Sequence, residues 1–401
     1  MKIAIIHSAN AGFFPRFYKN LKSSIESNNN ECRLFVPNNG ANNRCRLPNQ
    51  EIFGHRLNWQ IHYYLYKVCG IQDIFSLIST SSLIKKLKKF HPDILHFHIV
   101  NDKYLNIPLL VKFINKNNLP VVWTMHDCRA FTGECAYFDE LGCGKWKTGC
   151  GECPLQKSIV DNTKYQWRLR QKWHNLIEDL TIVTPSMWLA AFVSESFFKD
   201  KICKVIYNGV DISCFSTTSQ FNVRKKYNIS EDQHIVLGCA INWEVRKGMS
   251  YFEQLALKLP KTCQIVLVGG INDRDKARLQ DKGIIITGRT KTIEEMAAWY
   301  QNASVFVNPT LADNFPTTNI EALAAGLPIV TFNTGGSPEA IDKSTGLVVE
   351  QKDIDGLATA ILQIIKERNT IYTKEACMAR SKNFAVSQFD LYNSLYEEIL
   401  K

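Results

Sequence analysis

Two carboxylates, Asp313 and Glu321, stand eight positions apart in this chain. Pro316 fits the first turn of a helix and the Gly-Leu-Pro sequence at 326–328 stops one, so a helix is predicted over residues 317–325. Because a helix start offers unpaired N–H groups and a positive dipole end, this junction is predicted to hold a phosphate, with a hydroxyl-binding carboxylate on each side. The alternative is an ordinary solvated helix start, where acidic residues are common.

Two further loops carry groups that suit a phosphate. After a strand predicted at residues 235–239, Arg246, Lys247 and Gly248 place a point charge beside a glycine that lets the backbone approach closely. A basic helix start exposed to water is the alternative there. After a strand predicted at residues 329–332, the segment 333–339 forms a second glycine-rich loop.

The first half of the chain offers a histidine at the end of a strand. Residues 121–124 are predicted as a buried strand, so His126 is expected beyond its carboxyl end, where parallel sheets bind ligands. A single histidine at such a position is more often structural. Gly12, in the loop after the first predicted strand, is a candidate for ligand contact.

Five of the 13 cysteines fall between Cys128 and Cys153. The set Cys135, Cys143, Cys150 and Cys153 ends in a Cys-x-x-Cys pair, which fits a closed tetrahedral zinc site. Reduced thiols and two disulfides are the alternatives. The first residues are too short and wrongly flanked for a signal peptide, so a reducing compartment is expected, which disfavours disulfides.

The length of 401 residues, with 45% hydrophobic and 21% charged residues, favours two soluble globular domains. No apolar run reaches the ~20 residues that span a bilayer. Short apolar runs alternate with helical patterns, which indicates an α/β fold with two Rossmann-like parallel sheets. The predicted strands are residues 2–6, 33–36, 94–98, 121–124, 181–184 and 204–206 in the first sheet, and 235–239, 264–268, 284–287, 305–308, 329–332 and 346–349 in the second.

The first half of the chain carries most of the net charge of +10. Residues 1–200 hold 25 Lys and Arg against 16 Asp and Glu, whereas residues 201–401 hold 23 against 22. The lysine cluster at 85–89 and the aromatic segment at 59–67 suit peripheral contact with an anionic membrane. A solvated helix face and a core aromatic stripe are the alternative. A basic, zinc-containing nucleic-acid-binding protein is a further alternative, but acidic residues are mixed with the cysteines, so no nucleic acid is expected as a partner.

Residues 312–339, together with the loops around Lys247 and His126, resemble the donor site of the retaining glycosyltransferases of family 4. The cysteine-rich insert is similar to one in a subset of bacterial members that build surface polysaccharides. The resemblance implies the GT-B fold, in which two Rossmann-like domains face each other across a cleft. It implies an N-terminal acceptor domain at 1–206 with the insert at 128–154, a C-terminal donor domain at 207–382, and a helix at 383–401 that crosses back to the first domain.

Two positions depart from the pattern of that family. Asp313 stands where a Glu is usual, and Asn242 stands where an Arg is usual, five residues before Lys247. Arg246 is the candidate replacement for the missing cation. These departures keep a non-catalytic relative open as an interpretation.

The resemblance implies a hexosyltransferase that moves a sugar, with retention, from a UDP- or GDP-sugar to a glycan or lipid-linked glycan in polysaccharide biosynthesis. It would act in the cytoplasm, at the inner face of the cytoplasmic membrane, with no metal for catalysis because cations and helix ends neutralise the diphosphate. A nucleotide-sugar epimerase of the same fold is the enzymatic alternative.

Roles follow from the same resemblance. The catalytic residues would be His126, Asp313 and Lys247, with Asp313 on the donor sugar, Glu321 on the ribose, and backbone at 288–292 on the base. The donor contacts would be Arg246, Lys247, Phe315, Pro316, Thr317, Thr318, Glu321, Gly335, Gly336 and Ser337. The acceptor contacts would be Gly12, Tyr137 and Trp146.

Overall fold

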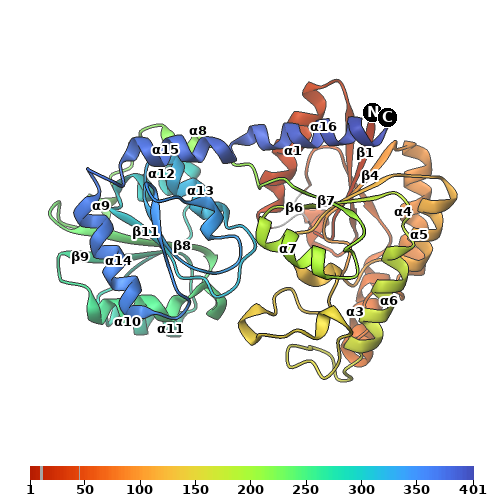
Figure 1. Cartoon of the computed structure of the whole chain (residues 1–401), viewed down its shortest axis with the longest axis horizontal. Helices are drawn as coiled ribbons and strands as arrows, with labels where there is room; N and C mark the ends of the chain where they lie inside the picture. The colour runs from red at the N-terminus through yellow and green to blue at the C-terminus, as the bar shows by residue number, and fades with distance from the viewer. Residues whose placement is uncertain (10–11, 45) are drawn as a thin grey trace. The chain divides into compact units, whose positions relative to one another are not determined.

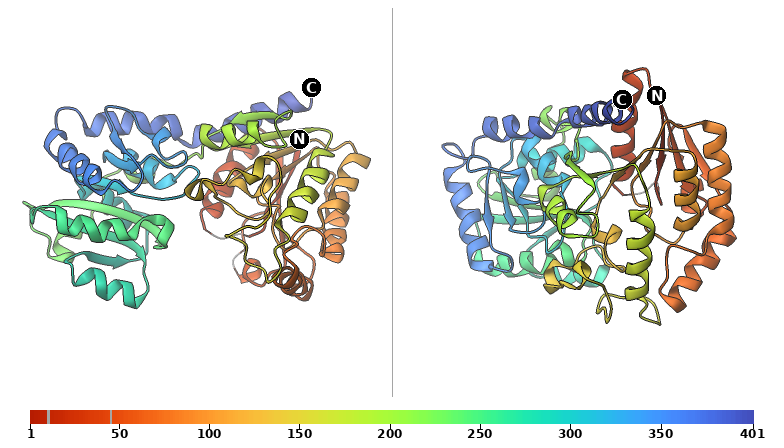
Figure 2. Two further views of the ribbon diagram at one scale, coloured as in Figure 1. Left: turned by 60° about the horizontal axis from the view of Figure 1, so that its bottom comes forward. Right: turned by 45° about the vertical axis from the view of Figure 1, so that its right-hand side comes forward.

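The computed structural model describes residues 1–9, 12–44 and 46–401, and it divides into two compact units (Figure 1). Unit 1 comprises Met1–Tyr207 and Phe389–Lys401, and unit 2 comprises Asn208–Gln388. Each unit contains one parallel sheet with helices on both of its faces, as the turned views in Figure 2 also show. This is the two-sheet α/β architecture that the alternation of apolar runs predicts.

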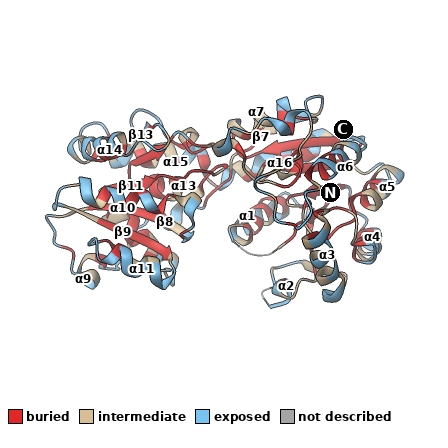
Figure 3. Cartoon of the chain, turned by 90° about the horizontal axis from the view of Figure 1, so that it is seen from below, coloured by how far each residue is buried: buried red, intermediate tan, exposed pale blue. Residues whose placement is uncertain are grey.

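The sheet of unit 1 has seven parallel strands in the order β3-β2-β1-β4-β5-β6-β7. Its strands are β1 (Lys2–Ile6), β2 (Glu31–Pro37), β3 (Gln50–Phe53), β4 (Ile94–Phe97), β5 (Val121–Thr124), β6 (Leu180–Thr184) and β7 (Ile202–Val205). The central strands β4, β5 and β6 are buried along their whole length because helices cover both faces of the sheet, and Figure 3 shows them as buried. The strand order reverses between β1 and β4, and in such sheets ligands bind beyond the carboxyl ends at that point.

The helices of unit 1 are α1 (Phe14–Ser27), α2 (Ala41–Arg44), α3 (Arg56–Cys69), α4 (Leu77–Phe90), α5 (Ile107–Lys116), α6 (Thr163–Asn175), α7 (Met187–Glu195) and α16 (Asp390–Ile399). The last helix returns from the far end of the chain and is fixed by buried hydrogen bonds. Tyr396 OH lies 2.7 Å from Nδ1 of His96 on β4, and Ser24 on α1 donates to Asp390 (2.6 Å). Both termini therefore belong to unit 1 (Figure 1).

Unit 2 has six parallel strands in the order β10-β9-β8-β11-β12-β13. They are β8 (His234–Asn242), β9 (Cys263–Gly270), β10 (Ile285–Gly288), β11 (Val305–Asn308), β12 (Ile329–Phe332) and β13 (Gly346–Val349). The helices are α8 (Ser213–Ser216), α9 (Val223–Tyr227), α10 (Met249–Lys258), α11 (Asp273–Gln280), α12 (Ile293–Asn302), α13 (Thr317–Ala324), α14 (Ile354–Glu367) and α15 (Lys374–Ser381). The order reverses between β8 and β11, which places the loops after these strands at the ligand-binding edge.

Two elements differ from the sequence prediction. The edge strand β3 is missed because its half-buried residues do not form a continuous apolar run. The last helix begins at Asp390 and not at residue 383, since the chain first makes two 3₁₀ turns, Lys382–Phe384 and Val386–Phe389. Ala385 between these turns is extended and pairs with Val210, and this bridge interrupts the helix.

The cysteine-rich segment between β5 and α6 has little regular structure. Its described residues form only three 3₁₀ turns, Cys128–Ala130, Asp139–Leu141 and Lys145–Lys147. Across residues 1–9, 12–44 and 46–401, no helix combines the length and the apolar character needed to cross a membrane.

Candidate active site

Lys247 and Asp313 meet at the carboxyl edge of the sheet of unit 2. Lys247 ends the 3₁₀ turn Val245–Lys247 that follows β8, and its Nζ forms an ion pair with Oδ2 of Asp313 in the loop after β11. The two side chains are 23% and 16% exposed. Asp313 Oδ1 also accepts a hydrogen bond from the N–H of Asn314 (2.9 Å). The structure thus brings together two of the three predicted catalytic residues.

The second glycine-rich loop interlocks with the Asp313 loop. The N–H of Gly336 donates to the carbonyl oxygen of Asn314 (2.7 Å). Gly335 has a φ of +57°, and a Cβ built on it would lie 1.7 Å from the carbonyl oxygen of Asp313. Only glycine fits this approach, which explains the residue type in physical terms.

Helix α13 begins at this same place with an uncapped end. Its N-cap, Pro316, has no side-chain hydrogen bond to the first turn, and Thr317 and Thr318 are half-exposed. Phe315 and Pro316 are buried, so they would contact a donor through their backbone atoms. The helix start therefore presents N–H groups and a positive dipole end next to Lys247.

The side chain of Ser337 lies beneath the start of α13. Its side chain is fully buried, and its hydroxyl lies 2.7 Å from Thr331 Oγ1 and accepts from Nδ2 of Asn319 (2.9 Å). The predicted place of Ser337 in a nest beside the diphosphate would therefore fall to its backbone, because the hydroxyl is committed to a buried network beneath α13. Ser337 supports the helix start from inside.

Glu321 lies one turn further along α13 and is half-exposed. One carboxylate oxygen accepts a hydrogen bond from the hydroxyl of Tyr300 (3.0 Å), a fully buried residue of α12. Burial raises the pKa of Tyr300 well above its ordinary value, so this hydroxyl stays protonated and donates. The tyrosine fixes the direction of the carboxylate.

The second cation of this edge is Arg289, which the sequence analysis did not single out. Arg289 follows β10, and its guanidinium donates to the side-chain oxygen of Asn242 and to the carbonyl oxygen of Ile241 (3.3 Å). Arg246 instead pairs with Glu244 (3.1 Å) and donates to the carbonyl oxygen of Ala312 (3.2 Å).

Among the ion pairs of the described residues, none involves Arg289. Its charge is therefore not neutralised by a carboxylate, while the charges of Lys247 and Arg246 are. The departure at Asn242 was the signal in the sequence, because Arg289 contacts this position.

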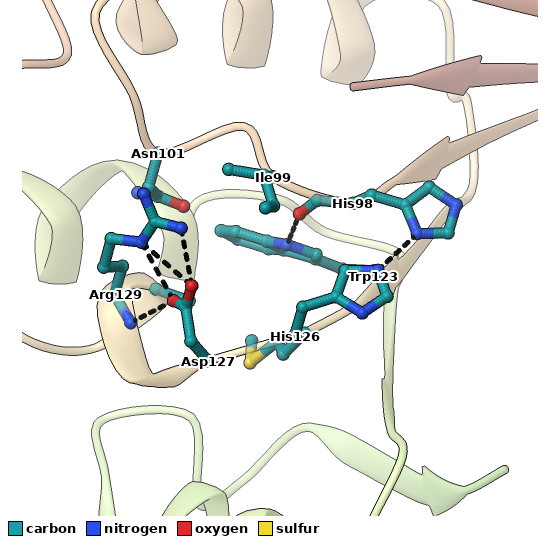
Figure 4. A pocket seen from close by; sticks show the side chains of 9 residues that line it. His98, Ile99, Asn101, Trp123, His126, Asp127 and Arg129 are labelled. Atoms are coloured by element: carbon teal, nitrogen blue, oxygen red, sulfur yellow. Dashed lines mark hydrogen bonds and ion pairs between the residues drawn. The ribbon is translucent and has the colours of Figure 1, made fainter. Parts of the chain in front are cut away.

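In unit 1, His126 lines a pocket beyond the carboxyl ends of β4 and β5 (Figure 4). Its Nε2 lies 2.9 Å from Nδ1 of His98, and Figure 4 shows the two rings side by side. The neighbouring Asp127 forms a bidentate ion pair with Arg129 (2.6 Å). The other residues that line the pocket are Ile99, Asn101, Trp123, Met125 and Ala130.

The histidines at this edge are neutral near pH 7. Burial lowers the pKa of His126 to about 4, against a smaller opposing effect of Asp127. Burial also lowers the pKa of His98 and of His7, which follows β1, well below the ordinary value. A neutral imidazole can accept or donate a hydrogen bond, but it does not supply a positive charge to the site.

The three predicted acceptor residues are placed differently from one another. Gly12 is exposed with a φ of +69°, and the ring of its neighbour Phe13 lies 5.1 Å from that of His126. Tyr137 is half-exposed beside Trp188. Trp146 is 2% exposed and belongs to the core, so the prediction that it touches the acceptor is wrong: the ring is needed to hold the cysteine-rich segment on unit 1.

The four cysteines of the predicted zinc site are neighbours with free thiols. The thiol of Cys135 donates to the sulfur of Cys153, which lowers the pKa of Cys153 to about 6 and raises that of Cys135. The N–H of Gly133 donates to the sulfur of Cys150 (3.2 Å). Within the described part of the chain, no three or more His, Cys, Asp or Glu side chains are arranged to hold a metal ion, so the zinc site stays a prediction.

Comparison with known families decides between the interpretations. Residues 16–213 match the model described as Glycosyltransferase Family 4, and residues 233–367 match the model described as Glycosyl transferases group 1. The chain belongs to the family 4 glycosyltransferases.

Curated relatives agree with this assignment. The Escherichia coli (strain K12) protein WcaC, named as a glycosyl transferase of colanic acid biosynthesis, is 27% identical over 66% of this chain and 65% of its own length. The Escherichia coli O-antigen biosynthesis glycosyltransferase WclY is 26% identical over 49% of this chain and 57% of its own length. The chain thus spans less than two thirds of the length of these relatives.

Solved structures share the fold over the whole chain. Sucrose-phosphate synthase from Thermosynechococcus elongatus has a TM-score of 0.70 at 17% identity and covers 100% of this chain and 99% of its own. Anabaena HepE, solved with UDP and glucose, has a TM-score of 0.69 at 13% identity and covers 99% of each chain. The fold is GT-B. Neither the epimerase nor the nucleic-acid-binding alternative gains support from these comparisons.

Proposed function

We propose that this chain transfers a hexose, with retention, from a nucleoside diphosphate sugar to a glycan or lipid-linked glycan in polysaccharide biosynthesis. The observation that carries the proposal is the meeting of Lys247, Asp313, the start of α13 and the Gly335–Gly336 loop at one edge of unit 2. These groups place a cation, a carboxylate and the first turn of a helix at one edge of the sheet. A sugar diphosphate needs all three kinds of partner.

The diphosphate would lie between Lys247 and the first turn of α13. The ammonium group and the helix end both favour the charge that develops on the leaving diphosphate. Asp313 would then release Lys247 and accept hydrogen bonds from hydroxyls of the donor sugar. Glu321, oriented by Tyr300, would accept from the ribose hydroxyls.

Arg289 would be the second cation on the nucleotide. It lies beside Asn242 at the end of β8, and no carboxylate among the described residues neutralises it. A cation held in place by neutral hydrogen-bond partners keeps its full charge for an anionic ligand. This role makes Arg246, which is already paired with Glu244, a minor contributor.

The reaction would break the bond between C1 of the sugar and the diphosphate oxygen and form a bond from C1 to the acceptor oxygen. The departing phosphate oxygen takes the proton of the acceptor hydroxyl, so no strong protein base is required. His126, neutral because its pKa is about 4, would position the sugar or the acceptor by hydrogen bonding. No catalytic metal enters this scheme.

Unit 1 would supply the acceptor side. Its pocket presents Arg129 and the buried Asn101, whose Oδ1 has no hydrogen-bond partner among the described residues. Exposed Gly12 and half-exposed Tyr137 are the further acceptor contacts that we propose. A lipid-linked acceptor would place the enzyme in the cytoplasm, in peripheral contact with the inner face of the cytoplasmic membrane.

Titration calorimetry with UDP, GDP, ADP and their sugars tests this function. We expect one nucleoside diphosphate and its sugar to bind with micromolar affinity, and we expect that nucleotide sugar to be hydrolysed slowly. Nuclear magnetic resonance should show that the released sugar first has the same anomeric configuration as the donor. Lys247→Ala should weaken the same binding at least tenfold. If none of the three nucleotides binds, the proposed donor is wrong. If the sugar is released as the inverted anomer, the proposed stereochemistry is wrong.

A further inference from the structure

Helix α3 turns its apolar side outward. Leu57, Ile61, Tyr64 and Val68 follow one another at intervals of four, three and four residues, so they lie on one side of the helix. All four are exposed, with Tyr64 exposed to 67%. Leu65 extends this stripe. A helix on a water-facing surface usually presents charged and polar residues there.

The inward side of α3 is polar by comparison. Its two buried residues are His62 and Tyr66. His62 Nδ1 lies 2.5 Å from the hydroxyl of Ser76, and the hydroxyl of Tyr66 donates to Glu134. Hydrogen bonds and the packing of Trp59 against the core hold the helix on unit 1, while most of its aliphatic side chains stay exposed. Burial of those residues would be favourable wherever an apolar phase is offered.

A neighbouring loop enlarges the stripe. Ile159 is 81% exposed, and its N–H donates to the carbonyl oxygen of Lys67 at the end of α3 (2.8 Å). The N–H of Val160 donates to the carbonyl oxygen of Val68 (3.1 Å), and Asn162 donates to that of Cys69 (2.7 Å). The loop before α6 thus lies beside the end of α3 (Figure 1). We call this surface the α3 face: Leu57, Ile61, Tyr64, Leu65, Val68, Ile159 and Val160.

Cations outnumber acids around the α3 face. The exposed or half-exposed cations on α3, the loop and α6 are Arg56, Lys67, Lys157, Lys164, Arg168 and Lys172. Between residues 54 and 72 there is no acidic residue, and between 154 and 173 the one acid is Asp161. That carboxylate accepts hydrogen bonds from the N–H groups of Cys153 and Thr163, so it serves the local turn.

We propose that the α3 face docks on a lipid bilayer that contains anionic lipid. The aliphatic and tyrosine side chains suit the acyl chains of such a bilayer, and the surrounding Lys and Arg suit its anionic headgroups. A second copy of this chain fits less well, because two cationic faces would repel each other. The proposal deepens the membrane contact of the proposed function, but it does not require that function.

This surface differs from the lysine cluster at 85–89. Lys88 and Lys89 lie in the last turn of α4, whereas the exposed Leu77 and Ile78 that lie nearer α3 begin that helix. Lys86 is paired with Glu51 (3.0 Å). The aromatic segment at 59–67 contributes to the α3 face, and the lysine cluster does not form its rim.

Co-sedimentation of the full chain with vesicles tests the proposal. Wild-type protein should bind phosphatidylcholine vesicles that contain about 30% phosphatidylglycerol at least tenfold more tightly than vesicles of pure phosphatidylcholine. The double variant Ile61→Glu, Tyr64→Glu should lose this binding. The double variant Lys157→Ala, Lys164→Ala should weaken it by about fivefold for each cation removed and reduce its sensitivity to salt.

Leu257→Glu is the matched control, because Leu257 is 74% exposed on α10 of unit 2 and should leave vesicle binding unchanged. Thermal unfolding of each variant confirms that the fold persists, as expected for exposed positions. Equal binding to neutral and anionic vesicles, or full binding by the Ile61, Tyr64 variant, would overturn the proposal. The proposal would also be overturned if wild-type protein bound no vesicles but dimerised in sedimentation velocity, and if the Ile61, Tyr64 variant lost this dimerisation. The α3 face would then be assigned to a second copy of the chain. Nucleotide binding is measured separately, so failure here leaves the donor site untouched.

Discussion

Replacing Asp313 by asparagine should tighten the binding of a free nucleoside diphosphate while it slows sugar transfer. In the structure without ligand, Asp313 holds the ammonium group of Lys247, so the diphosphate must compete with this carboxylate for the cation. Asparagine has nearly the same shape and keeps an oxygen that accepts the Asn314 N–H. The substitution therefore removes the charge and leaves the loop in place.

The magnitude follows from the exposure of the pair. A hydrogen bond to a charged group contributes about 1.5–3 kcal/mol, and the partial exposure of Lys247 and Asp313 to water reduces this to about 1–2 kcal/mol. Release of Lys247 should thus improve the dissociation constant of the nucleoside diphosphate by roughly 5- to 30-fold. Transfer from the intact donor should fall by about 100-fold, because Asp313 no longer accepts from the sugar hydroxyls in the transition state.

Isothermal titration calorimetry with the nucleoside diphosphate measures the first effect, and initial rates of transfer or donor hydrolysis measure the second. In the Lys247→Ala background the Asp313→Asn change should have no effect on nucleotide affinity, since the cation is absent. Glu244→Gln is the matched control: Glu244 pairs with Arg246 on the same loop but is well exposed, so affinity should change less than about twofold.

Weaker or unchanged nucleotide binding by Asp313→Asn would refute this reasoning. So would the same tightening in the Lys247→Ala background, because the effect would then not pass through the lysine.

Three further predictions test other parts of the molecule. Arg289→Ala should weaken nucleotide binding by about tenfold, because a charge-assisted contact is lost. Adding Asn242→Arg to this variant should restore most of the affinity. If calorimetry shows the double variant to bind as weakly as Arg289→Ala alone, Arg289 does not have this role. The melting temperature should fall as the pH drops from 6.5 to 5, because burial lowers the pKa of His96 to about 3. The neutral ring therefore contributes its full share to the free energy of unfolding above the unfolded pKa of about 6.5. Below that pH this share is lost at about 1.4 kcal/mol per pH unit. His62, His126 and His174, with pKa values lowered to about 4, 4 and 3, add to this slope, and a flat calorimetric melting profile in this window would contradict the burial argument. Protein purified without chelator should contain about one zinc per chain by plasma mass spectrometry, and Cys150→Ser should lose it; metal-free wild-type protein would leave reduced thiols as the interpretation.

Much of the donor edge could be predicted from sequence because its elements are local. The α13 start, the Gly335–Gly336 loop and Lys247 each follow an apolar strand, and the carboxyl ends of parallel strands meet at one edge of a sheet. The same reasoning located His126. It did not locate Arg289, because its contact with Asn242 joins two loops that are 47 residues apart, and only the packing of β8, β9 and β10 decides which side chains meet.

The sequence by itself determined the α/β class, most strands and the chemical character of the donor loops, since these depend on hydrophobic period, turn residues and residue type within short windows. The tertiary structure decided which groups are available. It buried Trp146 and Ser337, paired Lys247 with Asp313, left Arg289 without a carboxylate partner among the described residues, and turned the apolar side of α3 outward. Exposure and charge neutralisation arise from contacts between distant segments, and no local pattern of residues encodes them.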